Sequence, residues 1–127
     1  MTTETKNLGN LGEDAATKFL QNNGYKILDR NFQNNLGRRL GEIDIIAKEL
    51  KNGEIVFVEV KTREYEKYKN TLPEENITHA KLKKLNKIAS VYLRIKNLNN
   101  EPYRFDAISV WINTQTNEAK IKHIPSL

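Results

Sequence analysis

The chain has 127 residues, no cysteine and a formal net charge of +5. This length fits one domain, and the absence of cysteine excludes disulfides, thiolate metal sites and cysteine nucleophiles. The sequence has no apolar run near the ~20 residues that a membrane helix needs, and its start lacks the hydrophobic segment of a secretory signal. We therefore expect a cytoplasmic protein without a membrane partner, whose mildly basic charge favours polyanions such as nucleic acid.

Two helices are expected from the spacing of apolar residues and from the residues that cap them. The first is expected to start near Asn7 or Asn10 and to end at Asn23. Gly24 is a good stop for this helix, because glycine adopts the left-handed conformation that often follows a helix. The second helix is expected to begin at Thr78, since threonine is a favoured N-cap.

Five strands are expected from β-branched and apolar runs that are bounded by turn residues. They cover residues 25–32, 42–48, 54–63, 104–112 and 118–124. The resulting order, α-β-β-β-α-β-β, fits an α/β domain with a mixed central sheet flanked by helices. We expect one domain over residues 1–127, with its core at about 9–112.

One expected strand, "EIVFVEVKTR", carries charge inside an apolar run. Glu59 and Lys61 point to the same side of this strand, because side chains alternate along β structure. A charge taken out of water is costly unless it is paired with an opposite charge or holds a metal ion. The strand therefore needs a partner for these two side chains.

The turn that precedes this strand predicts where the partner lies. Asn52-Gly53 is a hairpin signal, and a two-residue turn at this place puts Asp44 opposite Lys61. Glu59 then lies on the same face as both. Directly opposed side chains have Cβ atoms about 5 Å apart, so two carboxylates and one lysine are expected to converge on a small patch.

Two interpretations of this patch remain open. In one, Asp44, Glu59 and the backbone carbonyl of Val60 bind Mg²⁺, or alternatively Mn²⁺, and Lys61 orients or deprotonates the attacking water. In the other, Asp44 and Lys61 form an ordinary cross-strand ion pair worth about 0.2–1 kcal/mol, and Glu59 is solvated at a sheet edge. The spacing of the residues does not distinguish a metal site from an ion pair.

Glu13 is a further acidic candidate, on the flank of the apolar face of the first helix. From there it could lean over the edge of the sheet into the same patch. The competing interpretation is a capping box, in which Asn10 caps the helix and Glu13 binds a backbone N–H.

The segments "GEDAA", "GEIDIIA" and "FVEVKTR", followed by a lysine in the next helix and by "RFD", resemble the YraN family of uncharacterised bacterial proteins. "EID" and "EVK", separated by a hairpin, also resemble the core of PD-(D/E)xK nucleases, with Ile43-Asp44 in place of Pro-Asp. The similarity runs from about Gly9 to Val110. It implies a restriction-endonuclease-like fold, similar to that of archaeal Holliday-junction resolvases.

The resemblance implies a role for each matching residue. Asp44 and Glu59 match the metal-binding acids, and Lys61 matches the motif lysine. Glu13 matches an acid on the first helix that assists at the metal. Lys81 falls, more loosely, where related nucleases place a polar residue near the substrate; the competing interpretation is a plain surface lysine.

Basic side chains in the loops and the second helix are candidates for binding nucleic-acid phosphates. They are Arg38, Arg39, Arg63, Lys67, Lys81 and Lys84. The competing interpretation is that these side chains form a solvated surface. Arg104 and Asp106 are expected to fix the fourth strand, and Trp111 is expected in the core rather than stacked on a base.

The resemblance implies a Mg²⁺-dependent endonuclease that hydrolyses phosphodiester bonds of DNA, including branched or single-stranded forms. It also implies a homodimer, because a four-way junction has two strands to cut. The alternative is a nucleic-acid-binding protein that has no catalytic activity and supports a partner enzyme, with strongly salt-dependent binding. A third interpretation is an α/β scaffold whose acids merely pair with cations.

Overall fold

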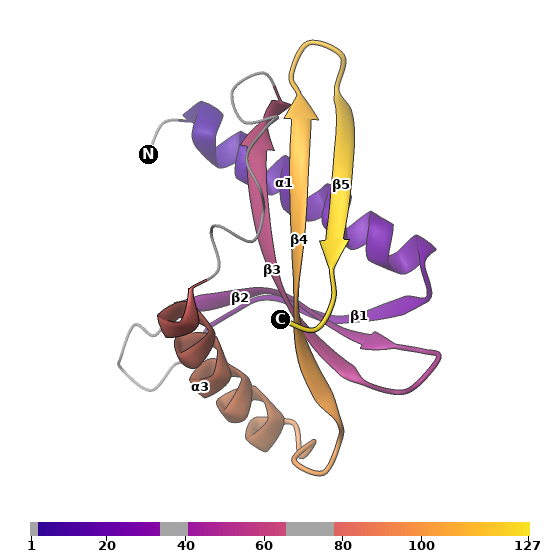
Figure 1. Ribbon diagram of the computed structural model, residues 1–127, viewed down its shortest axis with the longest axis vertical. Helices are drawn as coiled ribbons and strands as arrows, with labels where there is room; N and C mark the ends of the chain where they lie inside the picture. The colour runs from indigo at the N-terminus through magenta and orange to yellow at the C-terminus, as the bar shows by residue number, and fades with distance from the viewer. Residues whose placement is uncertain (1–2, 34–40, 66–77) are drawn as a thin grey trace.

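A computed structural model describes residues 3–33, 41–65 and 78–127. The described elements follow the chain in the predicted order (Figure 1): α1 (Thr3–Asn22), β1 (Tyr25–Gln33), β2 (Glu42–Glu49), β3 (Ile55–Glu64), α3 (His79–Ile95), β4 (Tyr103–Asn113) and β5 (Glu118–Ile124). The predicted order α-β-β-β-α-β-β is thus confirmed. Neither described helix is both long enough and apolar enough to cross a membrane.

The described strands form one sheet in the order β1-β2-β3-β4-β5. β3 and β4 are parallel and the other neighbours are antiparallel, so the sheet is mixed, as predicted. A parallel pair needs a crossover connection, and α3 lies in the connection between β3 and β4. In Figure 1, β3, β4 and β5 run side by side, whereas β1 and β2 run across the lower part of β3 and β4 in a different direction.

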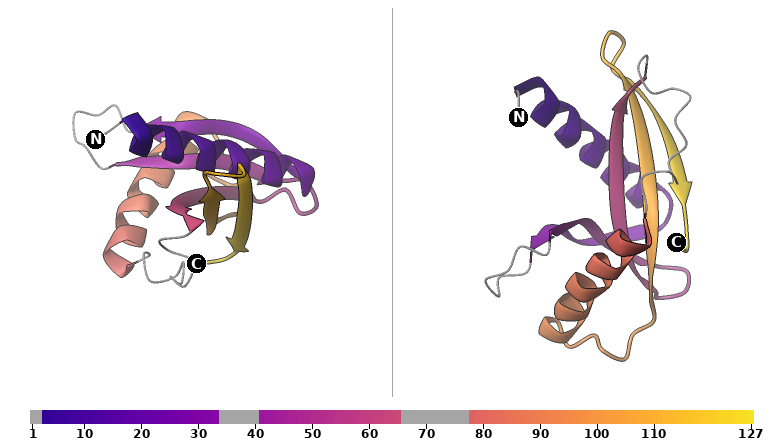
Figure 2. Two further views of the ribbon diagram at one scale, coloured as in Figure 1. Left: turned by 90° about the horizontal axis from the view of Figure 1, so that it is seen from above. Right: turned by 60° about the vertical axis from the view of Figure 1, so that its left-hand side comes forward.

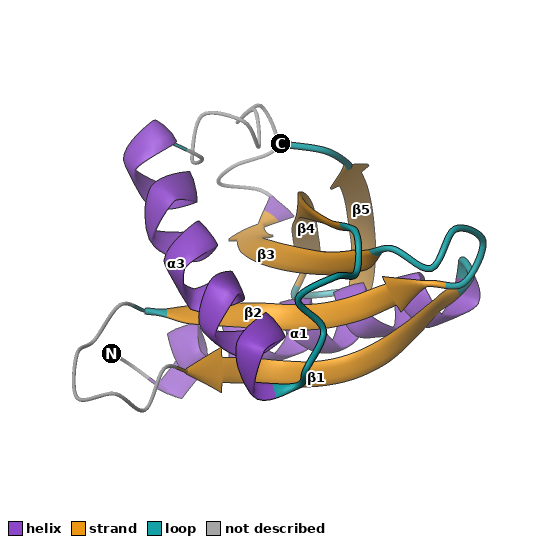
Figure 3. Ribbon diagram, turned by 90° about the horizontal axis from the view of Figure 1, so that it is seen from below, coloured by secondary structure: helices purple, strands orange, loops and turns teal. Residues whose placement is uncertain are grey.

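The two helices cover opposite faces of the sheet. Leu20 of α1 packs in one cluster with Val58 of β3. Phe57 precedes Val58 and therefore points to the other face, where it packs with Ile88 and Tyr92 of α3. Figure 3 shows the β1–β2 ribbon with α3 in front of it and α1 behind it. β3 is therefore covered on both faces, which explains its continuous apolar run.

Helix α1 begins earlier than predicted, at Thr3 rather than near Asn7 or Asn10. The residues before Asn10 include no proline and several good helix formers, so nothing local ends the helix there. Asn10 and Glu13 lie inside the helix, where backbone N–H groups already bond to the preceding turn. The capping-box interpretation of Glu13 is therefore wrong. The helix ends at Asn22, one residue before the predicted Asn23, and Gly24 follows with a φ of +86°.

The hairpin between β2 and β3 does not turn at Asn52-Gly53 alone. The backbone N–H of Glu49 donates to the carbonyl of Glu54 over 2.9 Å, so residues 50–53 form the connection. Asn52 Oδ1 accepts a hydrogen bond from the N–H of Glu54 at 2.9 Å, and Gly53 has a φ of +74°. The Asn-Gly pair is thus the second half of a longer turn.

The longer turn shifts the strand register by two residues from the prediction. Ile45 pairs with Val58, so the next position brings Asp44 beside Glu59. The predicted pairing of Asp44 with Lys61 is therefore wrong. Side chains alternate with a period of two, so a shift of two residues leaves all three charged side chains on the same face.

Beyond this point β2 and β3 separate. Their described pairing ends at Ile45–Val58, whereas β2 stays paired with β1 as far as Glu42–Gln33. β3 stays paired with β4 as far as Glu64. The sheet therefore divides, and Figure 2 shows the β1–β2 ribbon leaving β3 and β4. We call the opening between residues 42–44 and 59–61 the fork.

Candidate functional site

Asp44 lies at the inner end of the fork. Its Oδ2 accepts a hydrogen bond from the backbone N–H of Val60 at 2.8 Å. The side chain thus replaces the backbone partner that β2 no longer supplies, because a buried N–H needs an acceptor. The N–H and C=O of one strand residue point toward the same neighbouring strand, so the Val60 carbonyl also faces the fork.

Three carboxylates from two elements converge beside this bond. One oxygen each from Glu13 of α1 and from Glu42 and Asp44 of β2 lie within 4.8 Å of one another. This spacing suits one hard divalent cation, which takes oxygen ligands at about 2.0–2.6 Å. Glu42 was not predicted as a site residue. Strand alternation could have found it, because it precedes Asp44 by two residues on the same strand.

Strand β1 orients two of these acids. With its amide turned so that the nitrogen faces the carboxylates, Asn31 donates to Glu42 Oε1 at 3.0 Å and to Glu13 Oε1 at 2.9 Å. Asn31 has a φ of +54°, a left-handed conformation that asparagine tolerates better than most residues. Arg30 Nη2 lies 3.6 Å from Glu13 Oε1 and its Nη1 lies 3.0 Å from Asp14. One shared guanidinium does not balance three acids, so the ionised cluster keeps a net negative charge.

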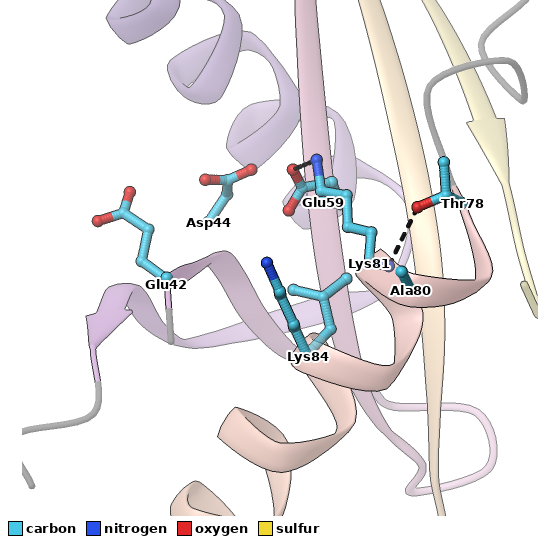
Figure 4. A pocket seen from close by; sticks show the side chains of 9 residues that line it. Glu42, Asp44, Glu59, Thr78, Ala80, Lys81 and Lys84 are labelled. Carbon is cyan, nitrogen blue, oxygen red and sulfur yellow. Dashed lines mark hydrogen bonds and ion pairs between the residues drawn. The ribbon is translucent and has the colours of Figure 1, made fainter. Parts of the chain in front are cut away.

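Glu59 lies next to this cluster but is not part of it. Its side chain is largely buried, and its Oε1 is 2.7 Å from Lys81 Nζ and 3.6 Å from Lys61 Nζ. Figure 4 shows Lys81 reaching from α3 onto Glu59, with Asp44 and Glu42 farther along the same cavity. Lys81 is therefore not a plain surface lysine, and the buried charge of β3 is paired with it.

The crowding of buried acids raises the pKa of Asp44. Burial is the largest cause and the Glu59 carboxylate is the next, while the hydrogen bond from Val60 opposes both. Together they raise the pKa of Asp44 from 3.8 to about 7. Burial also raises the pKa of Glu13. Burial and the neighbouring acids disfavour the charged forms of these carboxyl groups. A bound cation would favour the charged forms.

The two lysines on Glu59 have pKa shifts of opposite sign. Burial, followed by the neighbouring Lys81 ammonium, lowers the pKa of Lys61. Burial is also the largest single cause for Lys81 and would lower its pKa, but the hydrogen bonds to Glu59 and Lys61 and the charges of Glu59 and Asp44 together outweigh burial and raise the pKa of Lys81 overall. Lys81 is thus the tighter partner of Glu59, and Lys61 is the lysine that releases a proton more readily.

An open cavity of about 550 Å³ lies between β2, β3 and the first turns of α3. Glu42, Asp44 and Glu59 line one side of it, and Lys81 and Lys84 line the other (Figure 4). Walls of opposite charge suit an anionic ligand that arrives together with a cation.

The predicted nucleic-acid-binding residues do not all reach this cavity. Lys81 and Lys84 line it. Arg63 lies farther along β3, where it pairs with Trp111 of β4, and it is not among the lining residues. Three further predictions lie outside the described residues: Arg38, Arg39 and Lys67.

Arg104 and Asp106 fix β4, as predicted. Asp106 is fully buried, accepts from Arg104 Nε at 2.9 Å and lies 2.7 Å from His123 Nε2 of β5. Arg104 also donates to Glu54 Oε1 at 2.6 Å. Trp111 is 8% exposed, which confirms its predicted core position. None of these residues lines the cavity, so we assign them a structural role.

Comparisons with known proteins place this geometry in a family. Residues 12–110 match the model described as "Uncharacterised protein family UPF0102", a range that contains every acid of the fork. Three similar proteins, among many, are each named UPF0102 protein and align over 80–94% of this chain. They are from Clostridium beijerinckii (43% identical, 94% of this chain and 90% of the relative), Caldicellulosiruptor saccharolyticus (44%, 87% and 86%) and Persephonella marina (45%, 80% and 81%). The chain therefore belongs to the uncharacterised UPF0102 (YraN) family, as its sequence motifs predicted.

Proposed function

We propose that this chain is a metal-dependent endonuclease that hydrolyses phosphodiester bonds of DNA, with Mg²⁺ or Mn²⁺ as the cation. One observation carries the proposal: a cavity is lined by Glu42 and Asp44 of the acidic cluster, by Glu59, which pairs with Lys61, and by Lys81 and Lys84 of α3. Phosphodiester hydrolysis needs these three parts, namely cation ligands, a group that handles a proton and contacts to phosphate.

The resemblance to PD-(D/E)xK nucleases supports the same reaction. The resemblance to junction resolvases supports branched or otherwise structured DNA as the substrate. Cutting the two strands of a four-way junction would require two copies of the chain.

The donor set at the fork fits a hard divalent cation. Glu13, Glu42 and Asp44 offer carboxylate oxygens within 4.8 Å of one another, and Val60 directs its carbonyl to the same opening. The raised pKa of Asp44 supports this fit, because a bound cation would favour the ionised acid. Glu59 is paired with two lysines and lies outside the acidic cluster, so Glu42 rather than Glu59 completes the donor set.

Residues in and beside the cavity have distinct parts in the proposed reaction. When bound, Mg²⁺ would make a water molecule more acidic and neutralise charge on the phosphate. Asp44 is held in its orientation by the Val60 N–H. Burial and the neighbouring Lys81 lower the pKa of Lys61. Lys61 can therefore exchange a proton with the attacking water more readily than an ordinary lysine. Lys84, on the opposite wall, would contact the phosphate backbone.

Cleavage of single-stranded, duplex, flapped and four-way-junction DNA with Mg²⁺, Mn²⁺ or EDTA tests the proposal. Wild-type protein should cut at least one of these DNAs in a cation-dependent way. Asp44→Asn and Lys61→Met should each lower the rate by about 100-fold or more, because each removes a group required at the reacting phosphate. Asp14→Asn is the matched control: Asp14 sits on α1 next to Glu13 with its side chain 65% exposed, and its loss should leave the rate unchanged.

The variants also separate cleavage from binding. In EDTA, Asp44→Asn should keep the DNA affinity of the wild type, since the substitution removes a negative charge and no phosphate contact. DNA binding by the wild type with no cleavage under either cation would contradict the proposal and favour the non-catalytic binding protein. Cleavage that persists in Asp44→Asn would show that the fork is not the active site.

A further inference from the structure

Glu59 already has a cationic partner. Lys81 Nζ is 2.7 Å from its Oε1, and Lys61 Nζ is 3.6 Å away. Among the described residues, the carboxylates that lie within 4.8 Å of one another are Glu13, Glu42 and Asp44, without Glu59. A divalent cation bound beside Asp44 could gain Glu59 as a ligand only if this side chain turned toward the fork, which would weaken or break the contacts that both lysines make through its Oε1.

Lys81 can leave Glu59 without any movement of α3. Its backbone N–H is fixed at the start of the helix by Thr78 Oγ1 at 3.1 Å, while its side chain is 30% exposed. The lysine side chain is a flexible four-carbon stem that ends in a mobile point charge. Lys84 lies one turn farther along and lines the same cavity, yet it makes no ion pair with Glu59.

The lysines around Glu59 carry more positive charge than its carboxylate balances, which favours an anion. Two ammonium groups share one carboxylate, so the group made of Glu59, Lys61 and Lys81 carries one net positive charge when all three are ionised. A phosphate that enters the cavity meets Lys81 and Lys84 on the same wall. Lys61 lies on the same strand as Glu59 and stays close to it. The buried Glu59 carboxylate therefore keeps a cationic partner when Lys81 leaves.

We propose that Lys81 is a positioning residue that couples DNA binding to completion of the cation site. The inference rests on the proposed function. Without DNA, Lys81 holds Glu59 apart from the acidic cluster. A DNA phosphate in the cavity draws Lys81 to itself and releases Glu59 to the cation beside Asp44. Since such coupling is reciprocal, DNA tightens cation binding and the cation tightens DNA binding.

Calorimetric titration with Mn²⁺ in the absence of DNA tests this inference. Lys81→Met keeps the apolar stem and removes the ammonium, so it should tighten Mn²⁺ binding by at least about fivefold, the lower end of usual coupling between sites. Lys84→Met is the matched control, because it removes the same charge from the same wall without touching Glu59. Its effect on Mn²⁺ affinity should be clearly smaller.

Two further measurements separate release of Glu59 from a general change of charge. In a Glu59→Gln background, Lys81→Met should give little or no gain, because the carboxylate to be released is absent. In a titration with Ca²⁺, a short duplex DNA should tighten cation binding by the wild type at least about fivefold, and the gain should be much smaller for Lys81→Met.

The outcomes distinguish this inference from the proposed function. In one outcome, Lys81→Met binds Mn²⁺ no more tightly than the wild type, while Asp44→Asn abolishes Mn²⁺ binding. Lys81 then has no effect on cation binding, and the coupling role is overturned while the proposed cation site is supported. Equal gains from Lys81→Met and Lys84→Met would also overturn the coupling role. If neither the wild type nor any variant binds Mn²⁺, the proposed function fails, and the inference fails with it.

Discussion

Asp44 combines interactions that act on its charge in opposite directions. The Val60 N–H favours the ionised carboxylate, whereas burial and the Glu59 carboxylate disfavour it. Burial and the Glu59 carboxylate outweigh the hydrogen bond and leave the pKa of Asp44 at about 7. A buried acid with a raised pKa lowers the stability of the metal-free protein at neutral pH. Acids with strongly shifted pKa values cluster at functional sites.

The pH dependence of unfolding should therefore change when Asp44 becomes neutral. The folded protein holds a proton on Asp44 up to about pH 7, whereas the unfolded chain releases it near 3.8. The native state thus binds more protons between these values, and its free energy of unfolding falls as the pH rises through this window. Asp44→Asn removes this loss and keeps an acceptor for the Val60 N–H.

Urea unfolding in EDTA at acid and neutral pH measures this effect. Relative to the wild type, Asp44→Asn should gain stability as the pH rises from about 4 to above 7. The exposed variant Asp14→Asn should follow the wild type. Wild-type and Asp44→Asn stabilities that run parallel over this range would show that Asp44 is an ordinary acid.

Single residues also show how far the site could be predicted from the sequence. Charge in an apolar strand singled out Glu59 and Lys61, and alternation could have added Glu42. The partner of Lys81 could not be inferred in this way, because it depends on how closely α3 approaches β3. The role of Asn31 depends equally on the packing of β1 against α1, which no local pattern encodes.

Among the elements, α1 is positioned by an unusually close approach to β3. A Cβ atom added at Gly12 would lie 1.8 Å from Thr62 Oγ1 and 2.7 Å from its Cβ, so only glycine fits between the helix and the strand. Glu13 is the next residue of the helix and reaches the fork from this contact point. The closeness of α1 to the sheet therefore sets the place of one proposed cation ligand.

Gly12→Ala should disturb both stability and the site. The added methyl group overlaps Thr62, so we expect a loss of about 1–3 kcal/mol in the free energy of unfolding and weaker Mn²⁺ binding as Glu13 moves. Gly9→Ala is the control on the same helix, because nothing lies within 4 Å of its added Cβ. It should be neutral or stabilising by up to about 1 kcal/mol, and equal urea midpoints for the two variants would contradict the close-approach account.

The hairpin shows which part of an element can be predicted from sequence. The Asn-Gly pair located the turn, but residues 50–53 form it, so the predicted register was wrong by two positions. The shared face of Asp44 and Glu59 was nevertheless predicted, because a shift of two residues preserves side-chain direction. The length of a turn depends on how its ends pair, and the Asn-Gly pair within this turn does not determine it.

At the scale of the whole molecule, the fork explains why a basic protein has an acidic site. The chain carries +5 overall, which attracts a polyanion, yet three carboxylates meet where β2 leaves β3. A phosphate cannot approach those acids closely unless a cation lies between them. The positions of the strands along the chain were predictable from hydrophobic patterning. The divergence of β2 from β3 was not, because it arises from the packing of the whole sheet.

Anomalous diffraction from crystals grown with Mn²⁺ tests the central claim most directly, because it locates the cation without any assumption about the substrate. We expect an anomalous peak between the carboxylates of Glu13, Glu42 and Asp44, and its loss in crystals of Asp44→Asn. Well-ordered side chains at the fork with no peak between them, at Mn²⁺ concentrations that saturate ordinary carboxylate sites, would contradict the account.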